Sequence, residues 1–356
     1  MEKKIAVLPG DGIGPEVTAE AVKVLKVIAK RFNHSFDFQY GLIGGAAIDA
    51  TQNPFPEETK VLCKSADAIL FGAIGDPKFD NAAVRPEQGL LEMRKELGLF
   101  ANIRPVSCYD ALLSKTPLKA EIAKGVDFVV YRELTGGIYF GGKGRANDGL
   151  NAFDICSYSK QEILRIAKPA FEAADKRNKK LTLVDKANVL ETSRLWRETI
   201  LDFAKFYPNV EVNCMYVDNA AMQIILNPRQ FDIILTENMF GDILTDEASV
   251  IAGSLGLLPS ASIGNDYALY EPIHGSYPQA IGKNIANPIG AILSAAMMLE
   301  HSFNIPVESA YIYKAVKDAI ELEYLTPDLS SKKPFTTQEV GDKIAALIFE
   351  EVFEIV

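Results

Sequence analysis

The chain has 356 residues, of which 48% are hydrophobic, and a formal net charge of −10. This length can bury a large core and favours two domains, while the acidic balance argues against nucleic acid as a partner, because phosphate binding needs a basic surface. No stretch reaches the roughly 18 uninterrupted apolar residues of a membrane span and no signal-peptide pattern precedes the first strand, so a cytoplasmic protein that does not enter a membrane is expected.

Strands and helices are predicted to alternate from the N-terminus to about residue 236. Short apolar runs predict strands at residues 4–8, 36–40, 68–72, 128–131, 181–184, 210–216 and 232–236. Apolar residues at helical spacing predict helices from Pro15 to about Phe32 and at residues 57–65, 87–97, 160–176, 193–206 and 220–226. This alternation indicates an α/β protein.

Two segments depart from the alternation. Residues 136–149 are rich in glycine, and they lead into strand-like residues 152–157, so the segment 136–157 is expected to project as a β-arm. An exposed arm with strand edges needs a partner to cover it, which favours a dimer. The C-terminal stretch is predicted to form three helices, at residues 292–301, 307–322 and 338–353.

Two patterns that often mark cofactor or metal sites are incomplete in this chain. The sequence P-G-D-G-I-G-P-E at residues 9–16 follows a strand and opens a helix, but Pro15 stands where G-x-G-x-x-G has its third glycine. A tight glycine turn before a capped helix is therefore favoured over a dinucleotide-binding loop. The four cysteines lie far apart without a C-x-x-C pair, so they are expected to be reduced core residues.

Two aspartates lie four residues apart in the run N-M-F-G-D-I-L-T-D-E-A-S-V-I-A-G-S-L-G-L-L-P-S-A-S-I-G at residues 238–264. In a helix this spacing places the carboxylates of Asp242 and Asp246 on one face, where they repel each other unless a cation is bound. A solvated acidic face is the alternative. Against it, six apolar residues leave little of the helix for solvent: Phe240, Ile243, Leu244, Ala248, Val250 and Ile251.

Unpaired carboxylates on a buried helix are costly, so this pair is expected to have a ligand. Oxygen donors suit a hard divalent metal such as Mg²⁺ or Mn²⁺. A metal of this kind acts as a Lewis acid on a substrate oxygen.

Further segments, in order along the chain, resemble a known family. They are P-G-D-G-I-G-P-E, G-L-L-E-M-R at 89–94, A-N-I-R-P at 101–105, R-E-L-T-G-G-I-Y-F-G at 132–141, D-K-A-N-V at 185–189, the run at 238–264, E-P-I-H-G-S at 271–276 and G-K-N-I-A-N-P at 282–288. The chain resembles the isocitrate/isopropylmalate dehydrogenases, which are metal-dependent decarboxylating dehydrogenases, and within them the isopropylmalate branch. The resemblance covers the chain almost end to end.

The resemblance implies a fold that is not a Rossmann fold, with two domains, a central cleft and a β-arm. The first, cofactor-side domain would combine residues 1–100 and 253–356. The second would span residues 101–252 and carry the dimer interface and the arm at 136–157. The active site would lie in the cleft and would be completed by the neighbouring subunit of a homodimer.

The resemblance also implies site residues, position by position. The metal would be held by Asp242 and Asp246 of one subunit and by Asp218 of the other. Proton transfers would be carried by Tyr139 and by the Lys186 of the neighbouring subunit. The substrate would contact Arg94, Arg104, Arg132, Asp218, Leu90, Leu91 and Val189. Taken singly, each arginine could instead be a surface salt-bridge residue, the lysine a solvated side chain and the tyrosine a packed aromatic ring.

The residues around Arg94 select among the family's substrates. Arginine binds carboxylates through paired hydrogen bonds, and Leu90 and Leu91 lie four and three residues before Arg94 on the same predicted helix. An apolar wall beside a guanidinium suits a branched alkyl group attached to a carboxylate, whereas isocitrate dehydrogenases carry a polar residue in this region. The implied reaction is oxidative decarboxylation of (2R,3S)-3-isopropylmalate to 4-methyl-2-oxopentanoate and CO₂ with reduction of NAD⁺, in leucine biosynthesis.

In this reaction Lys186 would accept the alcohol proton as a neutral amine, a form that cationic surroundings favour. Tyr139 would protonate the enol carbon after CO₂ has left.

The implied cofactor is NAD, contacted by Ile13, Glu87, Glu271, His274, Gly275, Ser276, Gln279 and Asn287. NAD-dependent members usually carry aspartate at the position of Gln279, where its charge repels the 2′-phosphate of NADP. Glutamine lacks that charge, and the lysine and tyrosine of NADP-dependent relatives are also absent. NAD is therefore expected to be preferred with weak discrimination.

Three other interpretations remain open. The chain could act on tartrate, D-malate or isocitrate as another member of the same family. It could be a non-catalytic subunit, although such subunits usually lose charged site residues that are intact here. It could be a metal-dependent phosphotransferase, against which the absence of G-x-x-x-x-G-K-[ST] weighs.

Overall fold

The computed structural model describes residues 1–330 and 332–350, which form two compact units. The first unit contains Met1–Leu97, Gly253–Ala261 and the chain from Asn265 onward, and the second contains Gly98–Ala252 and Ser262–Gly264. The sequence analysis placed the domain boundaries near residues 100 and 253. The roles that it gave to the two parts stay predictions.

The first unit contains strands in the order β2-β1-β3-β12-β11, and the last two residues of β11 belong to the second unit. These strands are β1 (Glu2–Gly10), β2 (Ser35–Tyr40), β3 (Ala68–Ala73), β11 (Pro259–Ile263) and β12 (Ala268–Pro272). Its helices are α1 (Gly14–Phe32), α2 (Gly45–Thr51), α3 (Glu57–Ser65), α4 (Pro86–Glu96), α10 (Ile289–His301), α11 (Pro306–Glu321) and α12 (Thr337–Glu350). Helix α1 packs on α10 and α12, and α10 packs on β12 and α11, so these helices enclose the core of the unit.

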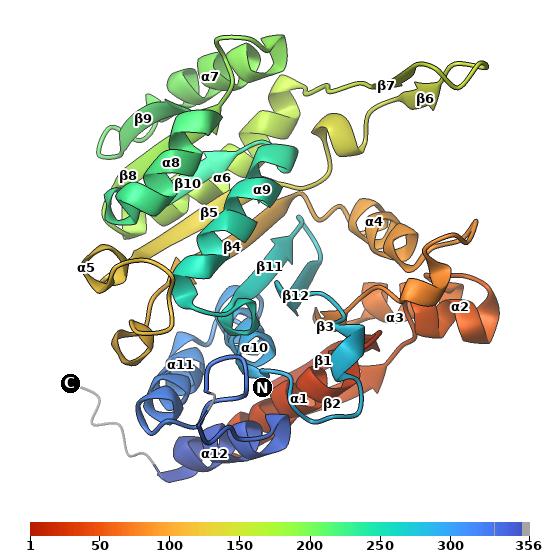
Figure 1. Ribbon diagram of the computed structural model, residues 1–356, viewed down its shortest axis with the longest axis vertical. Coiled ribbons are helices and arrows are strands. Elements are labelled where there is room, and N and C mark those ends of the chain that lie inside the picture. Colours follow the sequence, from red (N-terminus) through yellow and green to blue (C-terminus); the bar gives the residue numbers. More distant parts are fainter. Residues whose placement is uncertain (331, 351–356) are drawn as a thin grey trace. The chain divides into compact units, whose positions relative to one another are not determined.

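The second unit has strands in the order β4-β5-β10-β8-β9. They are β4 (Ala101–Ser107), β5 (Asp127–Glu133), β8 (Lys180–Asp185), β9 (Glu211–Tyr216) and β10 (Ile233–Thr236). The last four are parallel, and β4 runs antiparallel to β5. The helices are α5 (Ala120–Ala123), α6 (Lys160–Lys176), α7 (Glu191–Ala204), α8 (Val217–Leu226) and α9 (Asn238–Ser249). Figure 1 shows α8 and α9 in front of this sheet and α6 behind it.

Two short strands, β6 (Lys143–Arg145) and β7 (Ala152–Asp154), form an antiparallel pair within the predicted arm segment. They stand away from the rest of the second unit (Figure 1). The side chains of Leu150, Phe153 and Ile155 on this arm are exposed. Large apolar side chains gathered on one projection leave an apolar surface that a partner could cover.

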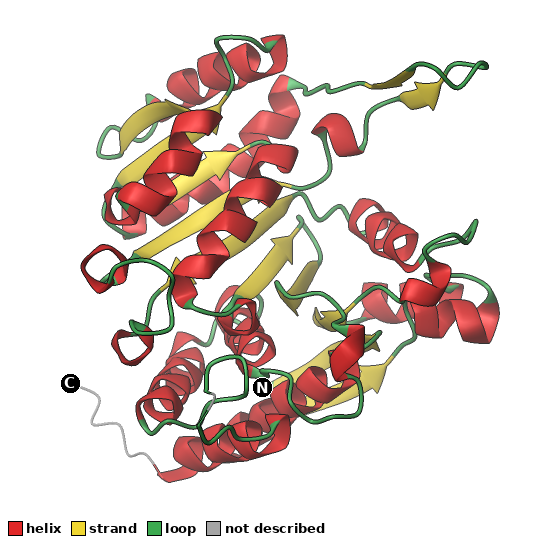
Figure 2. Ribbon diagram, viewed as in Figure 1, coloured by secondary structure: helices red, strands yellow, loops and turns green. Residues whose placement is uncertain are grey.

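The predicted alternation of strands and helices is confirmed, and the chain is an α/β protein (Figure 2). The sequence analysis did not predict β4, β11, β12 or α2. The strand β11 reads P-S-A-S-I and lacks the run of branched residues that marks a strand. The predicted helix at 338–353 corresponds to α12, and residues beyond 350 lie outside the described part of the chain. Of the four cysteines expected in the core, Cys63 alone is fully buried, and all four are free.

The N-terminal glycine motif forms a tight turn. Gly10 and Gly12 have φ angles of +71° and +61°, and a Cβ on Gly12 would lie 1.9 Å from the carbonyl oxygen of Ser276. Between them, the buried carboxylate of Asp11 accepts hydrogen bonds from the backbone N–H groups of Gly45, Ala46 and Gly75. Helix α1 begins at Gly14 and Pro15, and no side chain caps it. The prediction of a capped helix at this position is therefore wrong.

Across residues 1–330 and 332–350, none of the helices combines the length and the apolar character that crossing a membrane requires.

Candidate functional site

Two of the predicted arginines lie on adjacent strands of the second unit. Arg104 on β4 is opposite Val130, and Arg132 is two residues further along β5, so both side chains point to the same face of the sheet. Helix α9 packs on this face, against β4, β5 and β10. Both guanidinium groups are buried, and buried cations need anionic or polar partners.

Helix α9 supplies these partners from one face. Asn238, Asp242, Thr245 and Asp246 recur at positions i, i+4, i+7 and i+8, which is the helical repeat. Arg132 donates to the side-chain oxygen of Asn238 at 2.8 Å and to Asp242. The guanidinium of Arg104 donates to Thr245 and lies 3.7 Å from the carboxylate of Asp246.

The aspartates are less buried than the sequence suggested. Ile243 is 60% exposed and Val250 is 40% exposed, so two of the six apolar residues thought to shield the helix face outward. The side chain of Asp246 is 69% exposed and that of Asp242 is 37% exposed. The argument from buried, unpaired carboxylates is therefore wrong, because the arginines pair with them and solvent reaches them.

Tyr139 joins this cluster from a short 3₁₀ turn, Gly137–Tyr139, at the base of the arm. Its hydroxyl donates to Asp242 Oδ2 at 2.8 Å. Burial, together with the hydrogen bond to this carboxylate, raises the pKa of Tyr139. Although the Asp246 side chain is largely exposed, partial desolvation raises its pKa, Arg104 opposes the rise and Asp242 adds to it. The raised pKa makes Tyr139 a weaker acid, so in this state its hydroxyl is protonated at neutral pH and acts as a hydrogen-bond donor to Asp242.

Lys186 and Asp218 form a second cluster in the same unit. Lys186 follows β8 and Asp218 follows β9, and because these parallel strands are neighbours, the two side chains meet with Nζ 2.6 Å from Oδ1. The hydrogen bond from Lys186 lowers the pKa of Asp218. The sequence analysis placed Lys186 in cationic surroundings. In this chain its nearest charged group is instead a carboxylate. Val189, three residues on, is exposed.

The carboxylates provide oxygen donors that fit a hard divalent metal, and Asp242 and Asp246 are accessible enough to take one. Among the residues described, no three His, Cys, Asp or Glu side chains are arranged to hold a metal ion. The predicted metal site adds Asp218 of another subunit to Asp242 and Asp246, and this ligand set stays a prediction.

In the first unit, α4 carries Leu90, Leu91 and Arg94 in the predicted order. The guanidinium of Arg94 lies 3.1 Å from Glu271 on β12, and both side chains are largely buried. Leu91 is exposed and Leu90 is half-buried. The structure thus gives an apolar surface beside an arginine, but one donor of that arginine is engaged by Glu271.

A cavity of about 380 Å³ in the first unit contains four of the predicted cofactor residues, Ile13, His274, Gly275 and Asn287. Burial lowers the pKa of His274, which favours the neutral ring. His274 Nδ1 lies 2.9 Å from the carbonyl oxygen of Gly275, and Nε2 is buried without a hydrogen-bond partner among the residues described. A buried polar atom of this kind fits a ligand that supplies the missing hydrogen bond.

The other predicted cofactor residues, Glu87, Glu271, Ser276 and Gln279, do not line this cavity. The Ile13 N–H donates to Ser276, and the side chains of Ser276 and Glu87 both approach Gly75. Gln279 is exposed and does not line the cavity.

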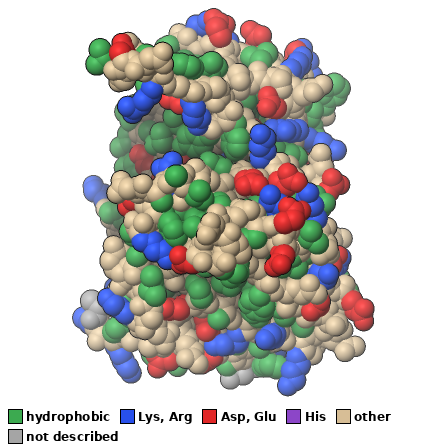
Figure 3. Space-filling model, turned by 90° about the vertical axis from the view of Figure 1, so that its right-hand side faces the viewer, with side chains coloured by type: hydrophobic (Ala, Val, Ile, Leu, Met, Phe, Trp, Pro, Cys, Tyr) green, Lys and Arg blue, Asp and Glu red, His purple; other side chains and the backbone are tan. Residues whose placement is uncertain are grey.

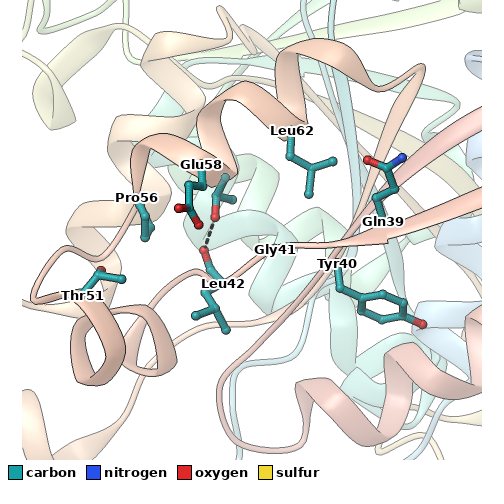
Figure 4. A pocket seen from close by; sticks show the side chains of 9 residues that line it. Gln39, Tyr40, Gly41, Leu42, Thr51, Pro56, Glu58 and Leu62 are labelled. Atoms are coloured by element: carbon teal, nitrogen blue, oxygen red, sulfur yellow. Dashed lines mark hydrogen bonds between the residues drawn. The ribbon is translucent and has the colours of Figure 1, made fainter.

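Another cavity, of about 330 Å³, lies near the end of β2 and α3, and its lining includes Leu42, Pro56, Glu58 and Leu62 (Figure 4). None of the predicted site residues lines it. It gives no reason to move the site.

Several residues of the clusters were missed by the sequence analysis. Asn238 and Thr245 share the helical face of the aspartates, a spacing that could have revealed them. Asp328 and Ser254 line the 380 Å³ cavity beside Asn287, and Asp328 accepts from the Asn287 amide at 3.1 Å. Asp328 follows α11 by only seven residues, and no motif marks it.

A buried carboxyl group, Glu237, precedes α9 directly. Burial raises its pKa to about 7, the nearby Asp185 carboxylate adds to the rise, and a hydrogen bond from Ser193 opposes it. In the unfolded chain the group titrates near 4.5, so unfolding releases a proton when the pH lies between 4.5 and about 7. Stability from this group is therefore present below about pH 4.5 and is lost as the pH rises towards 7.

Glu237→Gln should remove this dependence. As the pH rises from about 5 to about 8, the unfolding free energy of the variant minus that of the parent protein should increase by about 2 to 3 kcal/mol. Urea unfolding at a series of pH values measures the difference. Parallel pH profiles for the two proteins would contradict the raised pKa.

Lysine and arginine side chains lie intermingled with acidic ones on the face shown in Figure 3. Such mixing does not provide the continuous basic surface that phosphate backbones require.

Comparisons with known proteins agree with these features. A family model described as isocitrate/isopropylmalate dehydrogenase matches residues 4–344. A Bacteroides fragilis protein named 3-isopropylmalate dehydrogenase is 54% identical over 346 residues, which cover 96% of this chain and 97% of the relative. A Priestia megaterium protein of the same name is 54% identical over 355 residues, covering 98% and 96%.

Among solved structures, isocitrate dehydrogenase from Methylococcus capsulatus matches with a TM-score of 0.89 and 34% sequence identity, covering 97% of this chain and 99% of that one. The predicted family and fold are confirmed. The chain belongs to the isocitrate/isopropylmalate dehydrogenase family.

Proposed function

We propose that this protein catalyses the oxidative decarboxylation of 3-isopropylmalate, with NAD⁺ as the oxidant and a divalent metal as cofactor. The observation that carries the proposal is the cluster of Arg104, Arg132, Tyr139 and Asp242 in the second unit, which combines carboxylate-binding groups, a proton donor and a metal-binding carboxylate. The names of the relatives at 54% identity support the same reaction.

Substrate binding falls to the arginines. Arg104 and Arg132 are held in place by Thr245 and Asn238, so both guanidinium groups are oriented in advance to bind the carboxylates of a 2-hydroxy acid without a large loss of side-chain entropy. Arg94, with Leu90 and Leu91 on the same helix, would bind the end of the substrate that carries the branched alkyl group. The third carboxylate of isocitrate would lie against Leu90 and Leu91 there, and these side chains offer it no hydrogen bond.

Asp242 and Asp246, with Asp218 from a second subunit, would hold Mg²⁺ or Mn²⁺. When bound, the metal would supply a Lewis acid that stabilises negative charge on the substrate oxygen during oxidation of the alcohol and loss of CO₂. The ion pairs that Asp242 and Asp246 make with arginine keep these carboxylates in place for that role.

Two side chains would move protons. Lys186 must give up its ion pair with Asp218 before it can accept the alcohol proton as a neutral amine. Tyr139, whose hydroxyl lies 2.8 Å from Asp242, holds a proton at neutral pH and would deliver it to the enol carbon.

A homodimer with shared sites is part of the proposal. The two proton carriers belong to separate clusters, one with Asp242 and one with Asp218. Helices α8 and α9 expose Met222, Leu226 and Ile243, and the arm exposes three more apolar side chains. Burying these surfaces in a second copy would bring the clusters of two subunits together.

The substrate assay follows NADH absorbance with racemic 3-isopropylmalate, isocitrate, D-malate and tartrate, each with and without EDTA. We expect rapid turnover of 3-isopropylmalate alone, and loss of that turnover with the chelator. Equal rates with tartrate, D-malate or isocitrate would favour another specificity in the family. No turnover of any of the four acids, with metal present, would favour a non-catalytic subunit.

NAD is expected to be preferred over NADP, with weak discrimination. Gln279 lacks the negative charge that repels the 2′-phosphate of NADP. Gln279→Asp should therefore raise the ratio of kcat/KM for NAD to that for NADP, by about tenfold if one close like-charge pair is added near the phosphate.

The control for this prediction is Gln230→Asp, which places the same charge elsewhere on the chain. If the ratio is the same in the parent protein and the Gln279 variant, residue 279 does not approach the adenosine ribose.

A further inference from the structure

The strand order of the second unit places one residue between its two clusters. Strand β10 lies between β5, which carries Arg132, and β8, which is followed by Lys186. Because these strands are parallel, the residues after them lie at the same edge of the sheet. Glu237 follows β10 directly and is therefore next to the turn that carries Lys186.

Ser193, in the first turn of α7, joins the two. Its hydroxyl oxygen accepts a hydrogen bond from the backbone N–H of Lys186 at 3.1 Å. The same hydroxyl donates to Glu237 Oε1. Ser193 is completely buried and Glu237 is 4% exposed, so water does not compete for these bonds.

Other contacts hold the turn at the following residue. The N–H of Ala187 donates to Asp185, its carbonyl accepts from Arg194, and Arg197 binds the Asp185 carboxylate with two hydrogen bonds. The backbone N–H of Lys186 itself donates its hydrogen bond to Ser193. A hydroxyl can rotate, and its acceptor lone pairs face Lys186 only while its proton is committed to Glu237.

We propose that Ser193 and Glu237 are positioning residues for Lys186: Glu237 orients the Ser193 hydroxyl, and the hydroxyl holds the turn from which the lysine side chain reaches the substrate. The inference rests on the proposed role of Lys186 in proton transfer. It assigns a function to a buried carboxyl group that makes none of the substrate or metal contacts proposed above.

The groups facing Glu237 are Asp185 on β8, paired with Arg197, Cys156 at the end of the arm, and Tyr158 just after the arm. The raised pKa keeps Glu237 partly neutral near pH 7. In the neutral form, the carbonyl oxygen of Glu237 accepts the hydrogen bond from the Ser193 hydroxyl. The ionised form accepts more strongly. The turn should thus be held more tightly as the pH rises above 7, and Gln in place of Glu should keep the hydrogen bond without this pH dependence.

The test compares Ser193→Ala, Glu237→Leu and Glu237→Gln by two measurements. The first is amide hydrogen exchange at Lys186, corrected for intrinsic pH dependence. Ser193→Ala and Glu237→Leu should speed this exchange roughly tenfold, the factor expected when one net hydrogen bond is lost. The second is steady-state kinetics with 3-isopropylmalate, in which both variants should lose kcat by about tenfold or more with little change in KM, because misplacement of the lysine affects the transition state.

Glu237→Gln should keep most of kcat, and exchange at Lys186 should stay slow. The change in exchange rate between about pH 6 and about pH 8 should disappear in this variant. The matched control is Ser309→Ala, which removes a buried serine hydroxyl that donates to Ala296 in the first unit. It should leave exchange at Lys186 and kcat unchanged.

The outcomes separate this inference from the proposed function. If Lys186→Ala is inactive while Ser193→Ala and Glu237→Leu match the parent protein in exchange and kcat, the positioning role is wrong and the function stands. If Lys186→Ala is fully active, the proposed proton carrier is wrong. Should Glu237→Leu fail to fold, Ser193→Ala decides the matter alone, since it removes only one oxygen atom from the site.

Discussion

Asp246→Asn should abolish nearly all turnover, by on the order of a hundredfold or more, since changes even to groups behind metal ligands cost ten- to a hundredfold. The substitution keeps the shape of the side chain and removes the charge that attracts a cation. Because the Asp246 side chain is 69% exposed and its nearest cation, Arg104, is 3.7 Å away, the fold should tolerate the change. Initial rates at saturating substrate, with the unfolding temperature measured in parallel, give both quantities.

Glu247→Gln is the matched control, one residue further along α9, where the carboxylate has no assigned role. It should retain the parent activity. Chelation followed by desalting should reproduce the Asp246→Asn defect in the parent protein, and added Mg²⁺ or Mn²⁺ should reverse it. A protein that keeps its full rate after its metal has been removed would exclude the metal mechanism.

The fold was predictable where local pattern and burial agree. Strands such as β3 and β10 are short apolar runs that the structure buries on both faces. Helix α6 is preceded by Ser159 as its N-cap, and Ser159 and Glu162 form a capping box that stabilises the first turn. The strand β4 was missed because it carries Asn102, Arg104 and Pro105, which are poor strand formers. It is stabilised by its pairing with β5, a long-range contact that no local pattern reveals.

The candidate site shows the same limit. The spacing of Asp242 and Asp246 correctly indicated a shared helical face, but the burial argument failed because residues outside α9 decide which face is covered. Arg132 reaches Asp242 across more than a hundred residues of sequence. The link from Lys186 through Ser193 to Glu237 depends on β10 lying between β5 and β8, and no local segment of the sequence reveals the strand order.

Mixing two inactive subunits, Lys186→Ala and Asp242→Asn, should restore activity. Lys186 belongs to the cluster with Asp218, and Asp242 belongs to the cluster with Tyr139 and Arg132. If each active site combines one cluster of each kind from different subunits, a mixed dimer has one site with both defects and one site with neither. Equimolar exchange makes half of the dimers mixed, so about a quarter of the parent activity should return.

The matched control is a mixture of Lys186→Ala with Asp218→Asn. These residues share one cluster, 2.6 Å apart, so each site of the mixed dimer receives a damaged copy of that cluster and activity should stay low. Subunit exchange is confirmed by mass spectrometry of differently tagged chains before rates are measured. Recovery in the first mixture and not in the second requires that Lys186 act in the site of the neighbouring subunit. If exchange is complete and neither mixture recovers, each subunit uses its own lysine, and the shared site is wrong.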